Sequence, residues 1–117
     1  MIVKKDSLVT EIKKNIQGGN GAPAITHVVG DEILGSKGRM YSRIVLKSKD
    51  SIGYHQHVGE REIFYFLSGY GTVKDDEEIM KIGPGDVMVT PDQGYHSIEN
   101  TGTEDLVFMA LILNGDA

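Results

Sequence analysis

The chain has 117 residues, a length that fits one domain with a single hydrophobic core. It contains no cysteine, which excludes disulfide bonds, thiolate metal sites and cysteine nucleophiles and is compatible with the cytoplasm, where we expect the protein to act. The net charge of −5 comes from interspersed acidic and basic residues, so we expect no nucleic-acid partner. The N-terminal residues lack the apolar core of a signal peptide, and no apolar run approaches the ~18 residues of a membrane span, so we expect no membrane association.

Residues 1–24 are predicted to form an arm and loop ahead of one β-rich domain over residues 25–117. Apolar residues at positions 8, 9, 12 and 16 have the spacing of a short helix face, and the competing interpretation is an extended arm. Residues 17–23 are rich in glycine and end in proline, which predicts a loop. Because such an arm buries little by itself, we expect it to pack on the domain or on a second subunit.

The remainder of the chain has the pattern of short β-strands separated by glycine turns. Fifteen glycines against three prolines fit many tight turns, and strands at roughly ten-residue spacing favour a sandwich or a barrel. The last run is continuously apolar, so we expect it to be covered on both faces. The expected strands are 25–29, 39–47, one through His55 and His57, 62–68, 78–82, 87–89, one that opens at His96, and 106–113.

Two histidines in the first half of this domain are separated by one residue. On a strand, His55 and His57 point to the same face and converge, as two ligands of one metal ion would. Glu62 follows at the head of the apolar run 63–67, where its carboxylate can turn inward and needs a partner such as a cation. His96 is the fourth candidate ligand.

Three neutral imidazoles and one carboxylate suit one divalent first-row metal ion, namely Mn, Fe, Co, Ni, Cu or Zn. In an octahedral shell they leave two positions open for water or a small ligand. The alternative to a metal site is that the His-x-His sequence arises by chance or forms a hydrogen-bonded pair. Glu60, three residues after His57, is a rival carboxylate, but we interpret it as a solvated loop charge beside Gly59.

The same residues resemble the two motifs of the cupin superfamily. In the first motif, four residues separate His57 from Glu62 and six separate Glu62 from Gly69, while the leading glycine is displaced to Gly53. In the second motif, the matching residues are Gly85, Pro91, His96 and Asn100, with Gly94 shifted by one position. The resemblance covers about residues 39–113.

The resemblance implies a single jelly-roll β-barrel whose metal ligands are His55, His57, Glu62 and His96. It also implies a range of activities that includes dioxygenases, isomerases, epimerases, decarboxylases and lyases. Small cupins commonly pair, and the arm and apolar strands need cover, so we predict a homodimer.

Other side chains receive more ordinary interpretations. Strand alternation puts Tyr54 and Gln56 on the outer face, and it puts Phe64 and Phe66 on the face of Glu62 as a pocket wall, which ordinary core packing also allows. Arg43 is interpreted as a surface charge rather than a ligand for a substrate carboxylate. The remaining expectations are a surface or interface position for His27 and a solvated hairpin tip, not a cation site, at residues 75–78.

These observations favour a metal-dependent enzyme, of oxygenase or isomerase/lyase type, that acts on a small polar molecule in the barrel. The alternative is a non-catalytic cupin that binds or senses a small ligand. A structural or storage role is a third, weaker interpretation.

Overall fold

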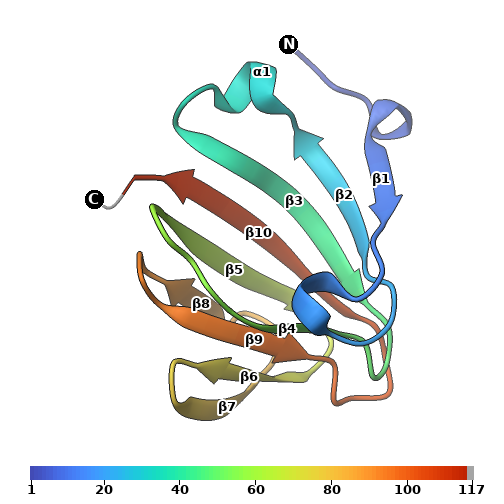
Figure 1. The fold of residues 1–117 in the computed structure, drawn as a ribbon. Helices are drawn as coiled ribbons and strands as arrows, with labels where there is room; N and C mark the ends of the chain where they lie inside the picture. Colours follow the sequence, from blue (N-terminus) through green and yellow to red (C-terminus); the bar gives the residue numbers. More distant parts are fainter. Residues whose placement is uncertain (116–117) are drawn as a thin grey trace.

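The computed structural model describes residues 1–115 and consists mainly of β-strands (Figure 1). Short helical turns occupy Lys5–Ser7 (η1), Ile16–Gly18 (η2) and Asp31–Leu34 (α1), of which α1 was not predicted. The strands are β1 Val9–Ile12, β2 Ala24–Val29, β3 Gly38–Leu46, β4 Ser51–Gln56, β5 Glu60–Ser68, β6 Gly71–Asp75, β7 Glu78–Ile82, β8 Val87–Thr90, β9 Tyr95–Glu99 and β10 Leu106–Asn114.

The strands form two antiparallel sheets that face each other (Figure 1). One sheet has six strands in the order β1-β2-β3-β10-β5-β8, and the other has four in the order β4-β9-β6-β7. The pairs β3-β10, β10-β5, β5-β8, β4-β9 and β9-β6 join strands that are not consecutive, so the chain passes back and forth between the sheets, as in a jelly roll. The predicted all-β jelly-roll barrel is therefore confirmed.

The core lies between the inner faces of the two sheets, and strand alternation decides which side chains enter it. On β3, Ser42, Ile44 and Leu46 are buried while Arg43 is exposed, as predicted. Phe66 of β5 and Phe108 of β10 are fully buried at 0% exposure, with ring centroids 5.5 Å apart. Burial of such large apolar side chains provides most of the driving force for folding.

A helix across positions 8, 9, 12 and 16 does not form, and the arm is extended there, with short helical turns before and after it at η1 and η2. Val9–Ile12 forms β1, which pairs antiparallel with β2 and becomes the outer edge of the six-stranded sheet (Figure 1). An amphipathic helix is stabilised by burying its apolar side chains, and here Val9 and Ile12 stay exposed. His27 on β2 contacts both neighbouring strands. Its Nε2 lies 3.3 Å from Glu11 Oε1 on β1, and its Nδ1 lies 3.0 Å from Ser42 Oγ on β3.

The last strand is covered less completely than expected. One face of β10 is buried, with Phe108 and Ala110 at 0% exposure, but its outer face is only half-buried. The expectation of cover on both faces is therefore wrong for the single chain. The acidic segment at residues 75–78 forms the tip of the β6–β7 hairpin, as predicted.

No helix within residues 1–115 is long and apolar enough to cross a membrane. The cytoplasmic location and the division at residues 24 and 25 stay predictions.

Gly69 ends β5 at a position that only glycine fits. Its φ is +84°, and a Cβ atom there would lie 2.2 Å from the Asp105 carbonyl oxygen. Gly85 has a similar φ of +89°, but a Cβ there would meet nothing within 4 Å.

We predict that Gly69→Ala lowers the free energy of unfolding by about 1–3 kcal/mol more than Gly85→Ala does. Both variants carry the cost of a left-handed alanine, whereas only the first collides with backbone. Urea denaturation followed by circular dichroism measures the difference, and equal losses would show that the backbone near Asp105 yields freely.

Candidate metal centre

Three strands bring the predicted ligands to one place inside the barrel. His55 lies on β4, and His57 directly follows that strand. β4 pairs with β9 so that His55 lies opposite His96, while Glu62 reaches the same point from β5 in the other sheet. The side chains of His57, Glu62 and His96 are buried, and His55 is half-buried.

The donor atoms of these four residues all lie within 4.8 Å of one another. The Oε1 atom of Glu62 is 2.9 Å from Nε2 of His57 and 3.2 Å from Nε2 of His96, and the two nitrogens are 3.1 Å apart. Two donors bound about 2.1 Å from one ion at about 90° to each other lie about 3.0 Å apart. The spacing of the donors therefore fits adjacent positions around one metal ion.

Each histidine is held through its other ring nitrogen. Nδ1 of His55 lies 2.7 Å from the Gly53 carbonyl oxygen, and Nδ1 of His96 lies 2.7 Å from Thr90 Oγ1. A carbonyl only accepts hydrogen bonds, so His55 Nδ1 donates and its Nε2 keeps the free electron pair that a metal needs. These contacts orient the Nε2 atoms toward the centre of the cluster.

The interpretation of Glu60 as a solvated loop charge is wrong. Its side chain is 13% exposed, and Oε2 lies 2.5 Å from Nδ1 of His57. The Arg39 guanidinium donates to the same carboxylate through Nε at 2.6 Å and Nη2 at 2.8 Å, a two-point pairing. Glu60 is thus the partner that orients His57 rather than a rival ligand.

The charges around the cluster shift its pKa values in opposite directions. The hydrogen bond to Glu62 raises the pKa of His57, and Glu60 adds to the effect, whereas burial lowers the pKa of His55. Burial alone would raise the pKa of Glu62, but hydrogen bonds from His57 and His96 outweigh it and lower that pKa. The pKa of Glu60 is lowered, first by its hydrogen bond from Arg39.

A cavity of about 120 Å³ opens beside the cluster. Phe64 lines it and stacks on the His96 ring with centroids 5.1 Å apart, whereas Phe66 packs in the core. Phe64 is therefore the pocket wall that was predicted, and Tyr54 and Gln56 lie exposed on the outer face as expected. The residues that line the cavity are Lys13, Ile16, Gln17, Ile25, Arg39, Met40, Ile44, Ile52, His55, His57, Glu62, Phe64 and Ile112.

Comparison with known proteins places this geometry in a family. The family model described as "Cupin domain" matches residues 42–112. The chain belongs to the cupin family. The cupin motifs and the four clustered donors are thus found on the expected fold.

A curated sequence and a crystal structure, both from Thermotoga maritima, match nearly the whole cupin chain. An "Oxalate-binding protein" is 38% identical over 113 residues, which cover 97% of this chain and 93% of the relative. A crystal structure of a predicted oxalate decarboxylase is also 38% identical, with a TM-score of 0.92 over 97% of this chain and 99% of that one. The structure of KdgF from Halomonas sp. has a TM-score of 0.77 at 17% identity, over 95% of this chain and 92% of that one, which shows a shared fold alone.

We predict that the metal-free protein is most stable near pH 6.5. The lowered pKa of His55 makes stability increase as pH rises toward about 6.5, because the unfolded chain then binds more protons than the folded one. The raised pKa of His57 has the opposite sign, so its stabilisation is complete below about pH 6.5 and is lost as pH rises through the folded value.

Urea denaturation of chelator-treated protein from pH 5 to pH 9 measures this profile, roughly the window of histidine titration. His57→Gln should remove the decline on the alkaline side, and His27→Gln, outside the cluster, should keep it. An alkaline decline that persists in His57→Gln would assign the effect to another group.

Proposed function

We propose that this cupin binds one divalent first-row metal ion through His55, His57, Glu62 and His96 and uses it to hold a small carboxylate such as oxalate. The observation that carries the proposal is the convergence of the four donor atoms at the spacing of adjacent ligands, beside a cavity. The ion would supply positive charge and open coordination positions for the oxygen atoms of the ligand.

The size of the cavity supports a very small ligand. Its volume of about 120 Å³ is well below the ~300–1,000 Å³ of pockets that take drug-sized molecules. A two-carbon dicarboxylate is among the ligands small enough for such a space. The relative described as an oxalate-binding protein adds support from 38% identity over nearly the full length.

The lining of the cavity favours binding over proton-transfer chemistry. Among residues 1–115, the titratable groups that line it are Lys13, Arg39 and three of the proposed ligands, His55, His57 and Glu62. A general acid or base must reach the reacting group, and a carboxylate or imidazole committed to a metal cannot do so freely. We therefore favour ligand binding over catalysis as the proposed function.

A metal-dependent enzyme of oxygenase or isomerase/lyase type is the second candidate. It is supported by the half-buried His55, which leaves one side of the cluster facing the cavity rather than closed by protein. Incubation of the metal-loaded protein with oxalate and assay of formate and carbon dioxide tests the lyase form. Product formed in proportion to protein concentration would favour the enzyme over the non-catalytic binding protein.

We predict about one first-row metal ion per chain in purified protein, and oxalate binding only when that metal is present. Removing one buried imidazole takes away a ligand, so His57→Ala and His96→Ala should each lose most of the metal and the oxalate binding. His27→Ala should retain both. Inductively coupled plasma mass spectrometry and isothermal titration calorimetry make the two measurements, and retention of metal by both site variants would overturn the assignment.

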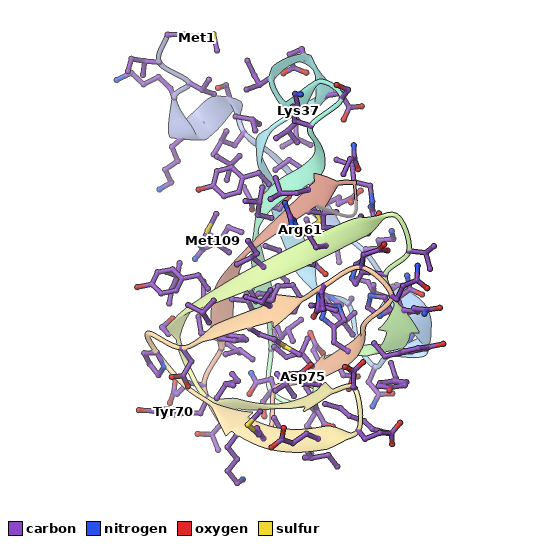
Figure 2. The ribbon with its side chains drawn as sticks, turned by 90° about the vertical axis from the view of Figure 1, so that its left-hand side faces the viewer. Met1, Lys37, Arg61, Tyr70, Asp75 and Met109 are labelled. Atoms are coloured by element: carbon purple, nitrogen blue, oxygen red, sulfur yellow. The ribbon has the colours of Figure 1, made fainter. Side chains whose placement is uncertain are left out.

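We also propose that the protein is a homodimer that pairs through the outer face of the six-stranded sheet. Register aligns Met109 with Tyr65 and Tyr65 with Val87, while Leu111 aligns with Ile63. Figure 2 labels Met109 on β10, beside the β5 ribbon. The large apolar side chains of this face that are exposed are Tyr41, Tyr65, Leu67, Val87 and Val89. An exposed apolar face of this kind, interrupted by Arg43 opposite Met109, is typical of an interface.

We predict that Tyr65→Glu yields a monomer, because a charge in the middle of an apolar interface would be buried without a partner. Ile79→Glu places the same charge at an exposed apolar position of β7, in the other sheet, and should leave the dimer intact. Light scattering after size exclusion gives the mass of each variant. A monomeric parent protein at micromolar concentration would contradict the proposal.

A further inference from the structure

One wall of the cavity comes from the N-terminal arm rather than from the barrel. Lys13, Ile16 and Gln17 line the cavity opposite the barrel residues, and η2 packs on β4 (Figure 1). None of the three belongs to a cupin motif, and all lie outside residues 42–112. The arm is therefore positioned to influence which ligand reaches the cluster.

A close contact between two glycines holds the arm against β4. A Cβ atom on Gly19 would lie 2.2 Å from the Ser51 carbonyl oxygen, and one on Gly53 would lie 2.0 Å from the Gln17 carbonyl oxygen. Hydrogen bonds reinforce the contact, from Ser51 N to Asn20 O at 3.0 Å and from Asn20 N to Ser51 Oγ at 2.8 Å. Any larger residue at either glycine would push η2 away from β4.

The backbone of this turn is strained, which shows how firmly it is held. Asn15 and Gln17 both adopt a left-handed φ of +53°. Asparagine tolerates this conformation, and the Asn15 side chain donates from Nδ2 to the Gly19 carbonyl at 3.0 Å. Gln17 gains no such relief from its side-chain type, so surrounding contacts must stabilise a conformation that costs on the order of 1 kcal/mol or more. Lys13 is thus carried by a fixed segment.

The charges that line the cavity are not balanced once a metal is bound. The charge of Arg39 is offset by Glu60, to which it is doubly hydrogen-bonded. Glu62 offsets one of the two charges of a divalent ion, and Lys13 then adds one more positive charge, so the loaded cavity carries two. Neutral imidazoles add nothing to this sum. A net charge of two positive complements a dianion.

We propose that Lys13 is a specificity-determining residue that makes the cavity select small dianions, such as oxalate, over monoanions and neutral molecules of the same size. This inference rests on the proposed function, because it assigns a role toward the carboxylate ligand of the same site. Lys13 is exposed at the mouth, so its effect is partly screened by solvent and salt. Its ammonium group favours the second negative charge of the ligand while the metal holds the first.

The experiment compares metal-loaded Lys13→Gln with Lys14→Gln, which removes an identical charge from the neighbouring residue that does not line the cavity. Calorimetric titrations use oxalate, the monoanion oxamate and neutral oxamide, three molecules of similar size, and metal content is measured on every sample. We expect Lys13→Gln to weaken oxalate binding about fivefold, an effect that shrinks at high salt. Oxamate binding should change less, and metal content should stay the same.

Lys13→Arg should restore most of the oxalate affinity, because it returns the positive charge on which the proposed selection depends. Equal oxalate affinities for Lys13→Gln and Lys14→Gln, with metal bound in both, would overturn the role of Lys13 and leave the proposed function standing. Absence of oxalate binding by the metal-loaded parent protein would instead overturn the proposed function and this inference together. Loss of metal in Lys13→Gln alone would show a structural role rather than ligand selection.

Discussion

The buried carboxylate of Glu62 is the constraint on which the rest of the site depends. An ionised carboxylate at 5% exposure is costly unless it is paired, and here two imidazole nitrogens lie within 3.2 Å of the same oxygen. One nitrogen directly follows β4 and the other lies on β9, both of the four-stranded sheet, while the carboxylate comes from β5 of the six-stranded sheet. The two sheets are therefore joined at the proposed metal site as well as through the apolar core. Without a metal, the Glu62 carboxylate and the imidazole nitrogens pair with one another, and the same atoms are spaced to bind a metal ion.

Around this centre, each histidine is held from a different direction. The backbone of β4 holds His55, the β5 carboxylate of Glu60 holds His57, and the β8 hydroxyl of Thr90 holds His96. These second contacts fix which ring nitrogen faces the centre, which a ligand for a metal requires. The Arg39–Glu60 pair extends the arrangement to β3, so that side chains of the six-stranded sheet position two of the rings and the β4 backbone positions the third.

The cluster itself was predictable from the sequence because its spacing is local and follows strand geometry. His55 and His57 share a face by period-two alternation, and Glu62 opens a recognisable buried strand. The fold followed from the glycine turns and from the resemblance to cupin motifs. The pairing of Arg39 with Glu60 could not be predicted, because it depends on β3, β10 and β5 lying side by side in one particular register.

The arm was misjudged for a related reason. Its apolar spacing fits a helix, but the backbone hydrogen bonds offered by the edge of β2 stabilise an extended chain, and propensity is weak against such pairing. The role of Thr90 likewise had no signal in the sequence, since a threonine before a proline is common in turns. Sequence spacing therefore predicts which residues of a single strand share a face, but it does not predict contacts between side chains of different strands.

This division has a consequence for how ligand choice arises in the fold. The donors sit on barrel strands or directly after one, and the shared architecture persists at 17% identity in the KdgF structure. A fold by itself does not specify a ligand. The residues that shape the mouth, Lys13 and Gln17, belong to an arm seated by the contact between Gly19 and Gly53. A change in that arm can alter the charge and size of the mouth without disturbing a single metal ligand. The proposed selectivity is thus separable from metal binding, because the arm that carries Lys13 contains none of the proposed metal ligands.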